Sequence, residues 1–342
     1  MNKLSIKSLI IASGVFGLSS GIAQAELLTI YGKVHVSGDY VAYPDSSDVA
    51  IGSNSSRIGF KGDKKLSHGF KGIWKFENEI DVSGESKPLS ARNRYLGLKH
   101  EFGTVLVGYH DTPFKSFGGK AGVFHDTIGE RRGILGAGNG NNKFNIRARN
   151  SVMYISPKLA GLEIRAMGST GNDTSKSEDS NGVKSFSAVY KMKSFYVGAA
   201  YEDQSKLADT DGRGIRVGAG VKLGKTKINA MFENLSSDSK DEFSRNAYGG
   251  SVTHSLGNVT VKAQLFLAAD NDTQSDTGGM LYALGADYKL AKSFTVYALY
   301  AGVNNQDNAK IVLAGSGHGE KYSPPNPGDN LWGVSGGMIY KF

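Results

Sequence analysis

Residues 331–342, LWGVSGGMIYKF, decide the fold of this chain. One alternate set of positions carries Trp332, Val334, Gly336, Met338, Tyr340 and Phe342. The other set carries Gly333, Ser335, Gly337, Ile339 and Lys341. Alternation with a period of two is typical of a β-strand with one apolar face, because successive side chains point to opposite sides of the strand.

The same alternation recurs from one end of the chain to the other. Sixteen segments of this kind can be placed, with approximate cores at 27–43, 55–62, 69–81, 92–100, 104–110, 147–156, 161–168, 184–191, 194–202, 213–223, 225–235, 246–255, 258–268, 280–290, 293–302 and 331–342. The apolar faces carry no charge, whereas the opposite faces are polar, charged or glycine. The pattern therefore predicts an all-β fold.

The connections between these segments alternate between short and long. The short ones are turns such as 101–103, 157–160 and 291–292. The long ones are rich in Asp, Asn, Ser, Gly and Lys, and lie near 44–54, 82–91, 111–146, 169–183, 203–212, 236–245, 269–279 and 303–330. Short turns at one end and long loops at the other are typical of an antiparallel transmembrane β-barrel, which must close because an open edge in lipid leaves backbone groups unpaired. We therefore predict a 16-stranded barrel around a water-filled lumen.

Composition excludes several other classes of protein. The 342 residues include 46 Gly and no Cys. Glycine costs about 1 kcal/mol in a helix interior, which excludes a helix bundle. The absence of cysteine excludes a disulfide framework, a thiolate metal site and a cysteine nucleophile. The 7 His are scattered, and the G-x-S-x-G pattern at 333–337 lies in mid-strand rather than at a strand-to-helix turn. No enzymatic activity, metal or cofactor is predicted.

The N-terminus has the pattern of a secretory signal. Lys3 and Lys7 precede an apolar stretch, and Ala23-Gln24-Ala25 fits the cleavage pattern. We expect 1–25 to be removed and 26–342 to form a single barrel domain. The signal's two lysines are part of the formal charge of +8. A basic chain can bind nucleic acid, but an exported one is not expected to meet it.

Several short motifs, in this order and spacing, resemble the trimeric general diffusion porins of Gram-negative outer membranes, with a lean toward the neisserial and β-proteobacterial branch. They cover essentially the whole mature chain: 30–33 (IYGK), 56–62 (SRIGFKG), 95–99 (YLGLK), 102–105 (FGTV), 150–157 (NSVMYISP) and the terminal Phe342. The resemblance implies an inward-folded third external loop, here 111–146, which narrows the lumen. It also implies that the barrel-assembly machinery reads Phe342.

The resemblance further implies a ladder of basic side chains on the wall opposite that loop. The corresponding positions are Lys33, Arg57, Arg92 or Arg94, and Arg147 or Arg149. Alternation independently places Lys33, Arg57 and Arg149 on the inward phase. In the segment 92–100, Leu96 and Leu98 take the outward phase. Arg92 and Arg94 then require a bulge or a position above the lipid band.

On the loop itself, the candidates for an acidic side are Asp111, Asp126 and Glu130. The family often has an acidic residue before its Phe-Gly-Gly motif, whereas this chain has Lys115 and Ser116 before residues 117–119. Further basic residues on the strands are Lys75, Arg165, Arg216, Lys222, Lys227 and Lys262, and those that oppose them are Glu77, Glu79, Glu163 and Glu233. The balance of these basic and acidic side chains predicts that the pore is weakly selective for anions.

The resemblance implies passive diffusion of small hydrophilic solutes and ions through a homotrimer that contacts outer-membrane lipid and lipopolysaccharide. Two alternatives remain open. The first is a porin with a saturable site for one class of solute. The second is a barrel whose loops act as an adhesin or antigen.

Overall fold

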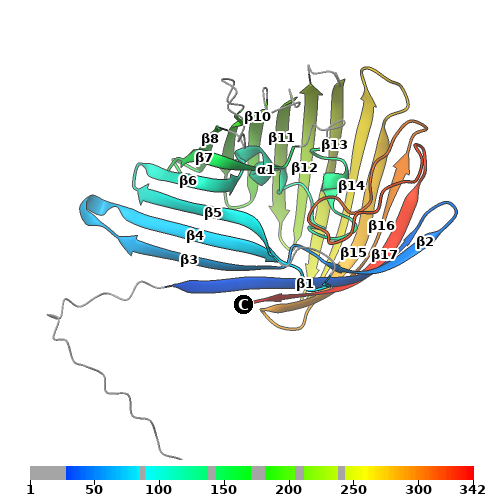
Figure 1. The fold of residues 1–342 in the computed structure, drawn as a ribbon, viewed down its shortest axis with the longest axis horizontal. Helices are drawn as coiled ribbons and strands as arrows, with labels where there is room; N and C mark the ends of the chain where they lie inside the picture. The colour runs from blue at the N-terminus through cyan, green and yellow to red at the C-terminus, as the bar shows by residue number, and fades with distance from the viewer. Residues whose placement is uncertain (1–27, 85–88, 138–143, 171–181, 205–211, 238–242) are drawn as a thin grey trace, which may run out of the picture.

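A computed structural model of the chain describes residues 28–84, 89–137, 144–170, 182–204, 212–237 and 243–342 (Figure 1). The predicted secretory signal lies outside these residues. Within the described residues, no helix is long and apolar enough to cross a membrane.

The described residues form one antiparallel sheet with three short helical segments. The strands are β1 (Thr29–Ala42), β2 (Ser47–Ser53), β3 (Arg57–Lys65), β4 (Lys71–Ile80), β5 (Leu89–His100), β6 (Gly103–Asp111), β7 (Arg147–Ile155), β8 (Leu162–Ser169), β9 (Lys184–Lys191), β10 (Phe195–Asp203), β11 (Gly212–Leu223), β12 (Thr226–Ser237), β13 (Phe243–Leu256), β14 (Val259–Asn271), β15 (Gly279–Lys289), β16 (Phe294–Asn305) and β17 (Leu331–Lys341). The helical segments are α1 (Pro113–Gly118), η1 (Ser67–Gly69) and η2 (Arg131–Gly133).

The sheet closes into a barrel of sixteen strand positions, as predicted. β1 pairs with β17 on one side, with Lys33 opposite Lys341. On its other side β1 pairs with β3 along its first part and with β2 along its last part, so β2 and β3 share one position in the wall. The stretch 44–54, predicted as a loop, contains a strand, because Val49 and Ile51 continue the alternation and extend the hairpin as β2.

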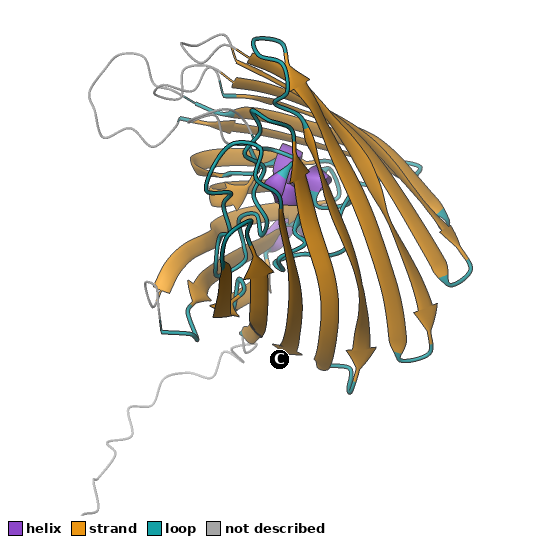
Figure 2. Ribbon diagram, turned by 90° about the vertical axis from the view of Figure 1, so that its right-hand side faces the viewer, coloured by secondary structure: helices purple, strands orange, loops and turns teal. Residues whose placement is uncertain are grey.

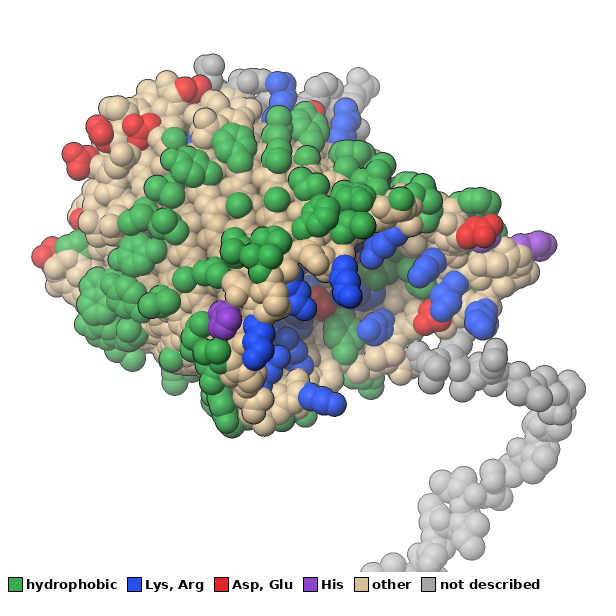
Figure 3. Space-filling model, turned by 180° about the vertical axis from the view of Figure 1, so that it is seen from behind, with side chains coloured by type: hydrophobic (Ala, Val, Ile, Leu, Met, Phe, Trp, Pro, Cys, Tyr) green, Lys and Arg blue, Asp and Glu red, His purple; other side chains and the backbone are tan. Residues whose placement is uncertain are grey.

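The predicted alternation decides which side of the wall each side chain faces. Along β17, Trp332, Val334 and Met338 are exposed on the outside, whereas Ser335 is buried inside. Figure 3 shows hydrophobic side chains spread over the outer surface of the barrel. This is the reverse of a water-soluble protein, and it suits a wall whose outer face meets lipid and whose inner face meets water.

The described residues between β6 and β7, 112–137 and 144–146, are here named the inner loop. They leave the wall after β6 and contact strands on the far side of the barrel. Phe114, Phe124 and Ile134 of this loop are fully buried or nearly so, in one cluster with wall residues that include Phe266 and Leu281. Figure 2 shows the helical turns of this segment within the curve of the sheet. The main apolar core of the molecule therefore lies between the inner loop and the later strands.

The connection between β16 and β17, residues 306–330, adds to the same core. Leu313 and Tyr322 are buried in it, and the Ala314 amide donates to the Ile128 carbonyl at 2.9 Å. This late loop therefore rests on the inner loop and supports it from the opposite side.

Candidate pore lining

A chain of ion pairs links the first strand to the inner loop. Lys33 on β1 contacts Asp126 at 2.9 Å. Arg132 then bridges Asp126 and Glu130, each at 3.0 Å. Arg131 completes the chain by contacting Glu130 at 2.6 Å. This chain of charges is named the ionic ladder below.

The ladder keeps both of its carboxylates charged. Burial alone would raise the pKa of Glu130, but Arg132 and Arg131 outweigh that effect and hold the pKa at about 2. Burial likewise opposes ionisation of Asp126, and Lys33 and Arg132 hold the pKa of that carboxyl well below its usual range. Both negative charges of this part of the loop are thus matched by cations.

A second set of contacts holds α1 against the wall. Arg216 on β11 and Glu233 on β12 lie directly opposite each other and are fully buried, with Arg216 Nε 2.5 Å from Glu233 Oε2. The Arg216 guanidinium donates to the Phe114 carbonyl at 3.0 Å and lies 3.9 Å from the centroid of the Phe114 ring. Glu233 also accepts from the Gly136 amide at 2.7 Å. This pair, named the loop clamp, satisfies backbone groups at both ends of the described loop.

Uncharged side chains of the neighbouring strands extend this attachment. Gln264 on β14 accepts from the Val123 amide at 3.1 Å and donates to the Gly129 carbonyl at 2.5 Å. Ser251 on β13 donates to the Ala121 carbonyl at 2.6 Å. The inner loop is therefore bonded to four consecutive strands, which fixes how far it projects from the wall.

The structure places three of the predicted wall residues inside the barrel. Lys33 is in the ionic ladder, and Arg57 lies opposite it in the β1–β3 register. Arg57 forms no ion pair in the part of the chain that the structure describes. Arg92 contacts Glu77 at 2.9 Å and also contacts Glu79. Of the two predicted explanations for Arg92, a bulge or a position above the lipid band, the bulge is present, since the register of β4 and β5 shifts between Phe76 and Asn78.

Two other predicted wall residues lie on the outer face. Arg94 keeps the phase of the exposed Leu96 and contacts Asn78. Arg149 is exposed and lies over the Tyr109 ring, 5.7 Å from its centroid. The inward prediction for Arg149 was wrong because a register shift interrupts the β6–β7 pairing and Asn150 adopts a positive φ of 49°. Beyond such an irregularity, the inward-facing residues change from one alternate set of positions to the other.

Arg147, the last of the predicted wall residues, lies where the inner loop leaves the wall. Arg147 contacts Asp111 at 3.0 Å, and Lys115 on α1 contacts the same carboxylate at 2.8 Å. Burial lowers the pKa of Lys115 to about 8, with Arg147 adding to the effect and Asp111 opposing it. All three predicted acidic residues are therefore ion-paired: Asp111, Asp126 and Glu130.

One arrangement resembles a catalytic triad but does not fit it. His318 is buried with Asp39 3.0 Å and Ser37 Oγ 3.4 Å away, yet both contact the same ring nitrogen, Nε2. A triad requires the carboxylate on one nitrogen and the hydroxyl on the other. Tyr322 also donates to Asp39 at 3.4 Å, so this group ties the late loop to β1. In the described residues, no cluster of His, Asp and Glu fits a metal ion.

A family model for the Gram-negative porin matches residues 11–308. This chain belongs to the Gram-negative porin family. It is 24% identical over 296 residues to the major outer membrane protein P.IB of Neisseria meningitidis serogroup B, covering 80% of this chain and 83% of that protein. The P.IB protein of Neisseria gonorrhoeae is 28% identical over 207 residues, 59% of this chain, and the match spans about half (53%) of that relative.

Solved porin structures share the fold. The anion-selective porin from Comamonas acidovorans matches with a TM-score of 0.80 at 21% identity, covering 93% of this chain and 100% of that one. The trimer form of OmpT from Vibrio cholerae matches with a TM-score of 0.69 at 18% identity, with the same coverage. The family and the closed barrel locate this porin in the outer membrane of a Gram-negative bacterium. They point to a channel rather than an enzyme.

The loop clamp is the feature of this porin that sequence reasoning missed. Arg216 and Glu233 were recognised as opposing lumen charges, but not as a pair. Counting outward from the turn at Gly224 and Lys225 brings the two residues opposite each other, and the structure has this register. The position of the hairpin turn therefore suffices to predict that Arg216 and Glu233 are paired. What the sequence did not show is that α1 would rest on the pair, with Gly118 so close that a Cβ would lie 2.1 Å from an Arg216 nitrogen.

The predicted assembly residue, Phe342, lies at the seam of the barrel. Its backbone exchanges hydrogen bonds of 3.0 and 3.3 Å with Gly32 on β1. A Cβ on Gly32 would lie 2.3 Å from the Phe342 ring, so only glycine leaves room for the ring there. The role of Phe342 as an assembly signal stays a prediction.

Proposed function

We propose that this porin is a general diffusion pore for small hydrophilic solutes and ions, with a weak preference for anions. The observation that carries the proposal is the imbalance of charge in the lumen. The inner-loop carboxylates Asp126 and Glu130 are neutralised by the ionic ladder, whereas Arg57 on the wall has no carboxylate partner among the described residues. A lumen with a net positive field attracts anions and repels cations.

The anion-selective porin from Comamonas acidovorans, which has the same fold, supports this direction. We also propose that the porin is a homotrimer, supported by the trimer form of OmpT. Lipopolysaccharide and the assembly machinery remain proposed partners.

Single-channel recording in a planar bilayer under a KCl gradient tests the proposal. We expect stepwise conductance with a reversal potential toward that of chloride. Arg57→Gln is expected to reduce the chloride preference, because it removes an unpaired lumen charge. Arg149→Gln is the matched control, since it removes an arginine from the outer face, and it should leave the reversal potential unchanged.

Each of the opposite results has a clear meaning. A reversal potential toward potassium in the unmodified porin would overturn the anion preference. An equal change of the reversal potential in the Arg57 and Arg149 variants would contradict the proposal that charges on the inner wall set the chloride preference. A folded, heat-modifiable barrel without conductance would contradict a diffusion pore.

A further inference from the structure

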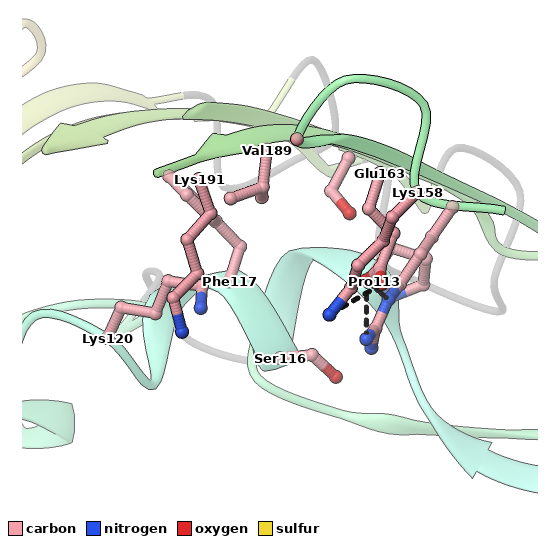
Figure 4. A pocket seen from close by; sticks show the side chains of 11 residues that line it. Pro113, Ser116, Phe117, Lys120, Lys158, Glu163, Val189 and Lys191 are labelled. Atoms are coloured by element: carbon pink, nitrogen blue, oxygen red, sulfur yellow. Dashed lines mark hydrogen bonds and ion pairs between the residues drawn. The ribbon is translucent and has the colours of Figure 1, made fainter. Parts of the chain in front are cut away.

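A basic cavity lies between α1 and strands β8 and β9, away from the ionic ladder (Figure 4). It has a volume of about 210 Å³ and is bounded at one end by residues 158–161 of the short β7–β8 turn. The cavity therefore lies near the end of the barrel that carries the short turns. Its charged lining residues are Lys120, Lys158, Glu163, Arg165 and Lys191.

The cations of this cavity outnumber its single carboxylate. Glu163 is already engaged by Arg165 at 2.8 Å and by Lys158 at 4.0 Å. In Figure 4 Lys158 and Glu163 stand on one flank, and Lys120 and Lys191 extend side by side on the other. Neither of these two lysines forms an ion pair with any described residue. The two unpaired lysines on one flank thus face a flank whose carboxylate is already neutralised.

The contacts of Lys120 show that the cations act on one another. Its ammonium lies 5.2 Å from the centroid of the Tyr196 ring, which holds it near the cavity. Burial lowers the pKa of Lys120, and the nearby Lys191 and Arg165 lower it further. Like charges gathered in this way are destabilising unless an anion joins them.

Hydroxyl groups complete the lining. Ser116 on α1 and Ser187 on β9 both border the cavity. Ser187 is 3% exposed, and its hydroxyl has no hydrogen-bond partner among the described residues. Ammonium groups supply strong charged donors and serine hydroxyls supply neutral ones, a combination that suits the oxygens of a phosphate-type anion.

We propose that this cavity is a transient binding site for multivalent oxyanions of the phosphate type as they pass through the lumen. The inference rests on the proposed pore function and names a substrate class for it. A multivalent anion interacts with several cations at once, whereas chloride carries a single charge to the same site. Phosphate-type anions therefore occupy the site long enough to hinder chloride, and the occupancy saturates.

The test titrates inorganic phosphate into the KCl solution on the short-turn side of single channels. Three proteins are compared: the unmodified porin, Lys120→Gln/Lys191→Gln, and the control Lys292→Gln. Lys292 is an exposed lysine in the β15–β16 turn, outside the lining of the cavity. In the unmodified porin, phosphate should reduce the chloride current to a plateau. The double variant should require roughly tenfold more phosphate for half of that reduction, because two of the four cations are removed. The control should match the unmodified porin.

A variant with the opposite expected effect on phosphate binding is the control for misfolding. Glu163→Gln removes the only carboxylate of the cavity and should lower the half-effective phosphate concentration by roughly threefold. Equal inhibition of all four proteins, or a linear loss of current without a plateau, would overturn the proposal.

Binding is also measured without conduction, from the ³¹P NMR line width of phosphate added to the purified porin in detergent. Broadening that is lost in the double variant and kept in Lys292→Gln supports the site even if the channel record contradicts the pore. A chloride-selective pore that leaves the phosphate line sharp would refute the site and leave the pore function intact.

Discussion

Two groups of charges in this barrel are organised in opposite ways. The ionic ladder and the loop clamp match cations with carboxylates, and the clamp pair is completely buried. In the basic cavity, Lys120 and Lys191 have no carboxylate partner among the described residues, and Glu163 is paired with Arg165 and Lys158. Charges that hold the inner loop are therefore neutralised within the protein, whereas charges that face passing solutes are left to be neutralised by them. The following experiments separate these two uses.

The largest effect is expected at the loop clamp. Arg216→Met leaves Glu233 buried without its cation, which we expect to cost about 3–5 kcal/mol of unfolding free energy. The measurement is urea unfolding of the porin in lipid vesicles. Because α1 loses its anchor, single-channel conductance should also rise.

The double variant Arg216→Met/Glu233→Met is the control for that experiment. It removes both charges, and replacing a buried pair by apolar groups is often nearly neutral. A double variant as unstable as the single one would show that the contact with Phe114, rather than the charge pair, holds the loop.

A smaller effect is expected in the ionic ladder. Asp126→Asn removes the negative charge shared by Lys33 and Arg132, which leaves Lys33 without its carboxylate partner and Arg132 with Glu130 alone. The ratio of chloride to potassium permeability should rise by roughly twofold, measured from the reversal potential. Asp307→Asn, at an exposed site in the late loop, is the matched control. A fall in the ratio for Asp126→Asn would mean that the ladder does not set the field of the lumen.

The smallest effect concerns pH. Lys115 has its pKa lowered to about 8, with Asp111, Arg147 and Arg132 as its charged neighbours. It is therefore charged below pH 8 and loses that charge as the pH rises through this value. The chloride preference should decline slightly between pH 7 and pH 9. Lys115→Gln should remove this decline, and an unchanged decline in the variant would assign it to another group.

The sequence was sufficient for the barrel because the signal is local. Alternation in β17 and β11 depends only on which face meets lipid, and the confirmed fold required no long-range information. The same rule failed at Arg149, and at Arg94 it allowed two solutions, because a bulge depends on the neighbouring strand as well as on the residue itself. The attachment of the inner loop was harder still. Arg216 and Gln264 act on loop residues more than one hundred positions away, and nothing in the local pattern encodes that contact.

The seam of the barrel has a consequence for how the molecule is made. The first strand, β1, pairs with the last, β17, with Lys33 opposite Lys341. The wall can therefore close only when the last strand is in place. Until β17 is in place, β1 has one unpaired edge, and such edges are prone to aggregation. Pairing between strands so distant in sequence is also intrinsically slow. Closure of the barrel therefore depends on the order in which its strands pair as well as on the stability of the finished wall.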